Sequence, residues 1–131
     1  MIFVDTNVPM YLIGAEHPHK TDAQRMLERA VAAQERLVTD AEVFQEILHR
    51  YVAIDRRDAI EPAFVLLRSL VQEVFPVDSA SVDRAKAIVL AYAGLSARDA
   101  IHAATMQQQE VTRILSFDAG FDRLPITRLP I

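Results

Sequence analysis

Cysteine and tryptophan are absent from this sequence of 131 residues, and lysine occurs only at Lys20 and Lys86. Without cysteine the chain has no disulfide and no thiolate metal site, and we expect it to work in a reducing cytoplasm. No apolar run approaches the roughly 20 residues of a membrane span. No basic segment precedes the short apolar start, so we expect no signal peptide. The length favours a single domain over residues 1–131.

The charge balance argues mildly against a protein that coats nucleic acid. The formal net charge is −4, whereas phosphate binding over a broad surface usually requires an excess of basic residues. All basic residues other than the two lysines are arginines, and the planar guanidinium group suits phosphate. The negative net charge therefore does not exclude a local contact between an arginine and a phosphate group.

Short apolar runs alternate with amphipathic segments along the whole chain. We expect strands at residues 2–4, 36–39, 72–77, 113–116 and 126–129. We expect helices at 7–14, 21–34, 58–70, 78–92 and 96–108, with a loop at 16–19 and one more helix after Asp40, on an apolar stripe of Phe44, Ile47, Leu48 and Tyr51. This alternation predicts a three-layer α/β/α fold around a short parallel sheet of about four to five strands.

Two aspartates follow predicted strands. Asp5 closes the first strand, and Asp118 lies just beyond the strand at 113–116. The carboxyl ends of parallel strands share one edge of the sheet, where ligands bind in such folds. Asn7 is a good N-cap for the first helix, which leaves Asp5 available for another role.

Taken singly, the other acidic candidates have ordinary explanations. Asp99 stands three residues after Ser96, the spacing of a capping box, and Asp118 suits a turn. Glu46 lies one helical turn before Arg50, as in a solvated ion pair, and by spacing Glu42 fits a functional role equally well. If the acids gather, they repel each other and some stay protonated unless a cation is bound. Oxygen-only ligands favour Mg²⁺ or Mn²⁺.

Four stretches occur in an order that resembles the PIN-domain ribonucleases, and more narrowly the VapC-type toxins. They are FVDTN, TDAEVFQEILHRY, LSARDAIHAA and ILSFDAGFDRL, and they span nearly the whole chain. The resemblance implies an acidic quartet of Asp5, Glu46, Asp99 and Asp118 and selects Glu46 over Glu42. It further implies that the three aspartates anchor a metal ion, and that Glu46 orients or deprotonates the attacking water.

The resemblance also suggests supporting residues. Thr6 and Ser116 match small polar residues that steady such sites. Asp40 is a departure, since relatives often carry serine there; it either caps the helix or adds a fifth charge. Arg98 is the first choice for a substrate-phosphate contact, ahead of Arg25, Arg29, Arg50, Arg56 and Arg57. We expect structural roles for His49 and His102 and a surface turn at Asp122.

The implied function is that of a toxin in a type II toxin–antitoxin system. Such a protein hydrolyses RNA phosphodiester bonds with Mg²⁺, or Mn²⁺, and leaves a 3′-hydroxyl and a 5′-phosphate. The family also implies a homodimer and a VapB-type antitoxin, with the apolar stretch at residues 62–75 as a candidate surface for either partner.

Other interpretations stay open at this point. The chain could be a PIN-fold module that binds RNA or a partner without catalysis, or a PIN nuclease that acts on DNA. A di-iron carboxylate bundle could use the Glu46–His49 and Asp99–His102 pairs, although the strand signals oppose it. A receiver-like domain would need an acidic pair after its first strand and a lysine late in the chain, and the only lysines here, Lys20 and Lys86, argue against it.

Overall fold

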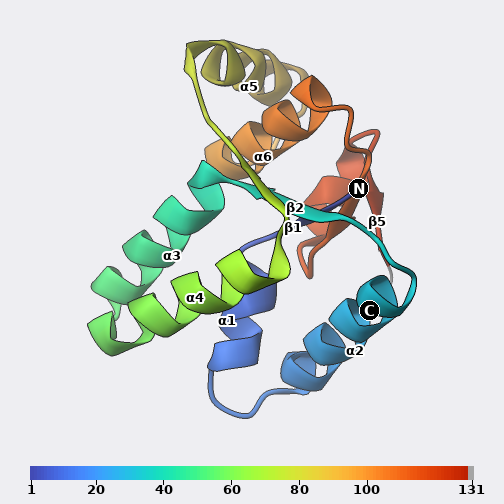
Figure 1. The fold of residues 1–131 in the computed structure, drawn as a ribbon. Helices are drawn as coiled ribbons and strands as arrows, with labels where there is room; N and C mark the ends of the chain where they lie inside the picture. Colours follow the sequence, from blue (N-terminus) through green and yellow to red (C-terminus); the bar gives the residue numbers. More distant parts are fainter. Residues whose placement is uncertain (130–131) are drawn as a thin grey trace.

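Five parallel strands form one sheet in the computed structural model, which describes residues 1–129. The strands are β1 (Ile2–Val4), β2 (Leu37–Asp40), β3 (Glu73–Phe75), β4 (Arg113–Leu115) and β5 (Thr127–Arg128). Their order, β3-β2-β1-β4-β5, places the first strand of the chain at the centre (Figure 1). The predicted parallel sheet is confirmed, with strand ends that differ by one to two residues from those expected.

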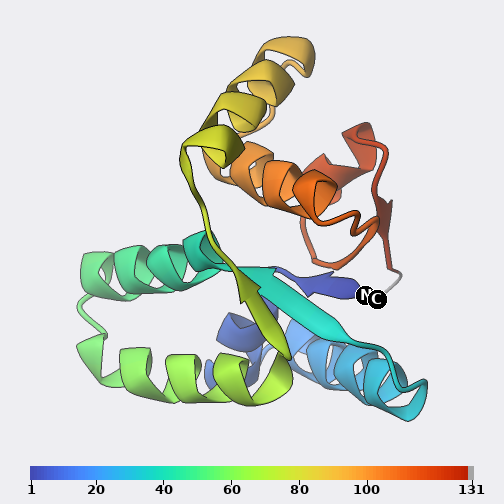
Figure 2. The same ribbon diagram turned by 45° about the horizontal axis from the view of Figure 1, so that its top comes forward.

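Six α-helices and two short 3₁₀-helices connect the strands. They are α1 (Asn7–Ile13), α2 (Pro18–Ala32), α3 (Ala41–Ala53), η1 (Arg57–Ala59), α4 (Ile60–Leu70), α5 (Ser79–Ala91), α6 (Ala97–Gln108) and η2 (Ala119–Arg123). Figure 2 shows α5 and α6 on one side of the sheet and α1, α2 and α4 on the other. This layered arrangement rules out the helical bundle that a di-iron site would need. None of the helices within residues 1–129 is long and apolar enough to cross a membrane.

The core lies on both faces of the central strands. All residues of β1 and β2 are buried, as expected for parallel strands covered by helices on each side. On α3, Phe44, Ile47 and Tyr51 pack into this core, but Leu48 is 42% exposed, so its expected place in the buried stripe is wrong. Leu48 and Val52 lie one turn apart, and both belong to an outward face of α3 that leaves them exposed.

Two helix starts differ from the sequence-based expectation. Helix α2 begins at Pro18 rather than Thr21, because the fixed φ of proline suits the first helical turn and the His17 side chain accepts a hydrogen bond from His19 N at 3.1 Å. The predicted capping by Asn7 is wrong: the N-cap position of α1 is Thr6, and no side chain among the described residues caps it. The Asn7 amide is directed toward the polar groups described next.

Candidate active site

The carboxylate of Asp5 is buried at the carboxyl end of β1, held by three neighbours. The Ser116 hydroxyl donates a hydrogen bond to Oδ2 at 2.6 Å, the Thr6 backbone N–H donates to Oδ1 at 2.8 Å, and Asn7 Nδ2 lies 3.4 Å from Oδ2. Thr6 thus supports Asp5 through its backbone, since its own buried hydroxyl has no hydrogen-bond partner within residues 1–129. Despite these donors, burial raises the pKa of Asp5.

Ser116 joins Asp5 to Asp118. Strands β1 and β4 are neighbours, with Val4 opposite Leu115, so the residues that follow each strand meet at one edge of the sheet. The Ser116 hydroxyl oxygen accepts a hydrogen bond from Asp118 N at 3.0 Å while it donates to Asp5. The Asp118 side chain is exposed and accepts from Gly120 N at 2.8 Å. The sequence-based expectation that both aspartates share one edge therefore agrees with the structure.

Asp99 comes to this edge from the first turn of α6. The Ser96 side chain caps the helix by accepting from Asp99 N at 3.1 Å, as the spacing predicted. Burial, a side-chain hydrogen bond with Asp118 and the negative charges of Asp5 and Asp118 raise the pKa of Asp99 to about 7. Three aspartates from distant parts of the chain therefore lie close enough to repel one another.

Glu46 reaches the same cluster from α3. Its Oε1 atom lies 4.0 Å from His102 Nε2, and that nitrogen lies 3.8 Å from Asp5 Oδ1. Burial opposes the ionised form of Glu46, but the hydrogen bond and charge of His102, with Arg50 and Arg98, hold its pKa below the usual value. Asp5 and Glu46 thus lie beside one buried imidazole, and Asp99 and Asp118 adjoin Asp5 on the same edge of the sheet.

The sequence analysis missed the network behind the acids, formed by Asp40, His102 and Thr105. Asp40 caps α3 by accepting from Val43 N at 2.9 Å, and it also accepts from the Thr105 hydroxyl at 2.8 Å. His102 Nδ1 lies 2.9 Å from Asp40 Oδ2, and all three side chains are buried. Asp40 therefore fulfils both roles left open by the sequence, as a cap and as an additional charge.

Asp40 also determines the charge of His102. Burial alone lowers the pKa of an imidazole, but the charge of Asp40, the hydrogen bond that Nδ1 donates to it, and the nearby carboxylates of Glu46 and Asp5 raise the pKa of His102 well above its usual value. These neighbours favour the positively charged form of His102. The only sequence signal for it is its position three residues after Asp99 on α6. His49, by contrast, is exposed on α3, so it has no buried structural role.

The oxygen donors in the cluster are of the type that a hard divalent cation prefers, and the raised pKa of Asp99 is consistent with negative charge that its neighbours offset only in part. In the arrangement described for residues 1–129, however, no three histidine, aspartate or glutamate side chains are placed to hold a metal ion. The cluster thus has the donor chemistry of a site for a hard cation, but its side chains are not arranged to coordinate one.

The candidate phosphate-binding arginines occupy different places. Arg98 Nη1 lies 4.0 Å from Glu46 Oε1, and Arg50 Nη1 lies 3.9 Å from Glu46 Oε2, so both guanidinium groups border the acids. Arg25 is 3.9 Å from Asp22 on the surface of α2. Asp122 is an exposed residue of η2 paired with Arg128, as expected for a surface turn. Arg98 and Arg50 are therefore the arginines best placed for substrate.

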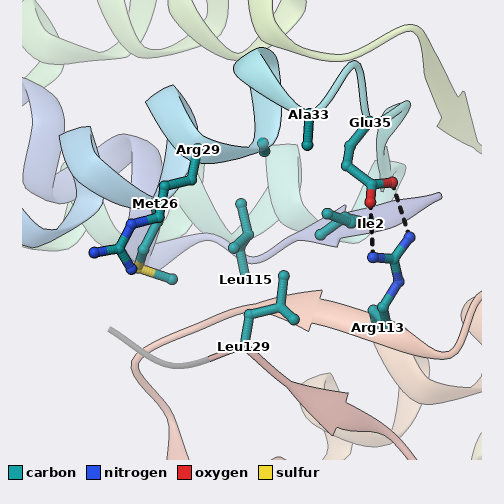
Figure 3. Close-up of a pocket in the computed structure, with 9 residues that line it drawn as sticks. Ile2, Met26, Arg29, Ala33, Glu35, Arg113, Leu115 and Leu129 are labelled. Atoms are coloured by element: carbon teal, nitrogen blue, oxygen red, sulfur yellow. Dashed lines mark hydrogen bonds and ion pairs between the residues drawn. The ribbon is translucent and has the colours of Figure 1, made fainter.

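Two cavities flank the sheet. A cavity of about 740 Å³ begins at Asn7 and Asp118 and extends between α1 and the end of α3. A smaller one, of about 210 Å³, is shown in Figure 3. The smaller cavity lies between α2 and the sheet and includes Ile2, at the opposite end of β1 from Asp5; beside it Glu35 and Arg113 form a bidentate ion pair at 2.8 Å. Of these two cavities, the larger is lined by Asp118 and the smaller by none of the four acids.

Comparison with known proteins agrees with this geometry. Residues 2–126 match the family described as PIN domain. Ribonuclease VapC13 from Mycobacterium tuberculosis is 58% identical over 125 residues, which cover 95% of each chain. Among solved structures, M. tuberculosis VapC20, described as a toxin that cleaves the sarcin–ricin loop, aligns with a TM-score of 0.77 and 22% identity over 93% of each chain. VapBC2 from Rickettsia felis, bound to a DNA fragment from its promoter, aligns with a TM-score of 0.74 and 12% identity over 98% of each chain.

Proposed function

The chain belongs to the PIN-domain family, among its VapC ribonucleases, and from this membership we propose that it is a toxin that cleaves RNA through its acidic cluster. The observation that carries the proposal is that Asp5 and Glu46 lie beside His102 and that Asp99 and Asp118 adjoin Asp5 at the same edge of the sheet. Several ionised carboxylates in one partly buried site repel each other and destabilise the fold, so their presence together suggests a catalytic role.

In the proposed mechanism, the aspartates Asp5, Asp99 and Asp118 would hold Mg²⁺ or Mn²⁺. When bound, such a cation supplies positive charge against the phosphodiester oxygens and favours deprotonation of water. Ser116 and Thr6 N–H fix the rotamer of Asp5, so this carboxylate is oriented before the cation binds. Hydrogen-bonding neighbours that orient ligands in this way raise metal affinity.

Glu46 is proposed to accept a proton from the attacking water. Its low pKa keeps it ionised at neutral pH, and an ionised carboxylate is a hydrogen-bond acceptor that can orient and deprotonate water. Arg98 and Arg50 lie on its open side, where their guanidinium groups can bind the phosphate that enters. No side-chain nucleophile is needed, in keeping with a chain that has no cysteine.

We further propose that the protein acts as a single PIN domain in the cytoplasm, is a homodimer, and is inhibited by a VapB-type antitoxin. The family supports this assignment, and so do apolar side chains left exposed on α3 and α4. Val52 is 44% exposed, Ile54 62% and Val65 59%. Only part of the stretch at residues 62–75 is available to a partner, because Ala63, Leu67 and Phe75 belong to the core.

The decisive experiment compares the wild-type protein with Asp5→Asn. We expect brief expression of the wild type to produce new RNA 5′-ends and growth arrest, and the Asp5→Asn protein to produce neither. With purified protein, cleavage should require Mg²⁺ or Mn²⁺ and stop in EDTA. Asp83→Asn, a change on the exposed face of α5, is the matched control and should cleave like the wild type.

A melting curve separates a chemical from an architectural role for Asp5. The buried carboxylate has a raised pKa, so at pH 8 without metal its replacement by a neutral amide should leave the protein at least as stable. RNA cleavage that persists unchanged in Asp5→Asn would show that these acids are not the active site. A PIN-fold module that only binds RNA would bind equally in both forms and cleave in neither.

A further inference from the structure

Four aromatic rings gather on one wall of the 740 Å³ cavity that begins at the acids. Tyr11 comes from α1, His17 and His19 from the start of α2, and Phe117 from the segment after β4. Aromatic residues make up only 7% of the sequence, and it contains four histidines. Two of these histidines lie in this cluster, so its composition differs sharply from that of the rest of the chain.

The rings contact one another as a continuous group. His19 is stacked on Phe117 with ring centres 4.3 Å apart and planes inclined by 27°. Tyr11 contacts Phe117 edge to face at 5.1 Å, His19 at 5.0 Å and His17 at 4.9 Å. Tyr11, His19 and Phe117 are only half-buried, and His17 is exposed. Part of the ring surface is therefore open to a ligand in the cavity.

The cavity combines an apolar lining with polar groups that could bind a nucleotide. Three of the four rings carry a hydroxyl or ring nitrogens, which can form hydrogen bonds with the edge of a base. Arg50 also lines the cavity, and its guanidinium group is half-exposed and lies near Glu46. Arg56 on the same wall is already paired with Asp58 at 3.0 Å, so Arg50 is the cation better placed for a phosphate.

The position of Phe117 ties the rings to the reaction. Phe117 immediately precedes Asp118, and its backbone N lies 3.4 Å from Asn7 Oδ1. The amide nitrogen of Asn7 in turn contacts Asp5. An RNA strand whose reacting phosphate lies at the acids must either run along this wall of the cavity or leave the site on the opposite side. Bases inside a duplex are stacked on their neighbours and cannot present a face to a protein ring, whereas unpaired bases can.

We propose that Tyr11, His19 and Phe117 form a binding site for an unpaired base of the RNA substrate, next to the bond that is cut. This inference rests on the proposed ribonuclease function and adds to it a subsite that holds one base beside the reacting phosphate. The ring faces stack on the base without a strong sequence preference, because every base has a π-face. Arg50 holds the neighbouring phosphate.

The first test measures base binding without cleavage. Wild-type protein in EDTA is titrated with adenosine 5′-monophosphate and, separately, with ribose 5-phosphate, which has the sugar and phosphate but no base. We expect the nucleotide to shift the NMR signals of the Tyr11, His19 and Phe117 rings saturably, and ribose 5-phosphate to leave these signals nearly unchanged. Equal responses to the two probes, or no response from the rings, would refute the site.

The second test uses variants and a labelled single-stranded RNA of 12 nucleotides, with the same strand in a duplex as a comparison. Tyr11→Leu keeps an apolar side chain of similar reach but removes the ring, and we expect single-strand affinity to fall about 10-fold. Tyr11→Phe keeps the ring and should bind within about 2-fold of the wild type. Tyr92→Leu, the same change at a half-buried tyrosine next to α5, is the matched control and should have no effect.

The outcomes separate this inference from the proposed function. If Asp5→Asn still cleaves RNA while adenosine 5′-monophosphate shifts the rings, the active-site assignment fails and the base site stands. Wild-type single-strand affinity in Tyr11→Leu would refute the base site and leave the acids unaffected. Loss of antitoxin inhibition in Tyr11→Leu with unchanged RNA binding would show that the cavity is a protein-binding site, which also refutes the proposal. If Tyr11→Leu does not fold, the nucleotide titration of the wild type decides.

Discussion

His102 and Asp40 form a buried ion pair directly behind the acidic cluster. His102 Nδ1 lies 2.9 Å from Asp40 Oδ2, while its other ring nitrogen, Nε2, lies 3.8 Å from Asp5 Oδ1. The ring of His102 therefore lies between Asp40, which has no role in the proposed reaction, and Asp5, which has one. The negative cluster is partly balanced from inside the protein, before any cation arrives.

The Asp40–His102 pair should contribute strongly to stability. Asp40→Ala removes the α3 cap and leaves a buried imidazolium without its partner, and such a loss costs about 3–5 kcal/mol. Asp78→Ala is the matched control, because Asp78 caps α5 through a capping box and its removal should cost about 1 kcal/mol. Urea unfolding of the two variants measures the difference. Equal losses would mean that Asp40 stabilises the protein only as a cap.

Metal-free protein should lose stability as the pH rises toward neutrality. Folded Asp99 keeps its proton to about pH 7, whereas the unfolded group releases it near 3.8. The folded state thus binds more protons between these values, and the free energy of unfolding falls as the pH increases through them. Melting temperatures in EDTA at pH 5 and pH 8 should differ more for wild type than for Asp99→Asn.

Mg²⁺ provides the complementary measurement. A cation that binds the ionised acids should raise the melting temperature at pH 8 more than at pH 5, where Asp99 holds its proton. The same pH dependence in wild type and Asp99→Asn would show that Asp99 does not have the raised pKa assigned to it.

Ser116 is predicted to act through Asp5. Ser116→Ala removes the 2.6 Å hydrogen bond to Asp5 and the acceptor for Asp118 N, so metal affinity and RNA cleavage should both fall by about 10- to 100-fold. Higher Mg²⁺ concentrations should restore part of the rate. Ser69→Ala removes an exposed hydroxyl that bonds only Leu66 O on α4, and it should cleave normally. Loss of activity in Ser116→Ala that Mg²⁺ does not restore would contradict the orienting role.

Arg98 should contribute to RNA binding through charge alone. Arg98→Gln is expected to weaken binding to all RNA sequences alike and to reduce the slope of log affinity against log salt by about one. Fluorescence anisotropy measures RNA affinity at salt concentrations from roughly 50 to 200 mM and so checks both effects. Arg25→Gln, at a position 64% exposed on α2, is the control. Identical salt slopes for the two variants would place Arg98 outside the phosphate path.

The parts of the fold that depend on local pattern were predictable from the sequence. Apolar runs such as Ile2–Val4 marked the strands, and parallel topology then placed Asp5 and Asp118 at a common edge. Residue spacing also located the helix that carries Asp99. The resemblance to a known family was needed for Glu46, because spacing alone did not separate it from Glu42.

The missed features depend on contacts between distant residues. Asp40 lies 62 positions before His102 in the chain, and no local pattern shows that they pair. Asn7 has the chemistry of a helix cap, but a partner 109 residues away, Ser116, attracts its amide instead. The segment at residues 16–19 resembled an ordinary loop, because the ring of Phe117 that completes its aromatic cluster comes from the far end of the chain.

The central position of β1 has a consequence for protein synthesis. The first strand to leave the ribosome must wait for β4, more than 100 residues later, before its second edge is paired. Ser116 and Asp118 also emerge only with this last part of the chain. At ribosomal rates of about 5–20 residues per second, a nascent chain stays harmless for several seconds. A cell that makes this protein therefore holds an incomplete acidic site until β4 and the residues that follow it have been synthesised.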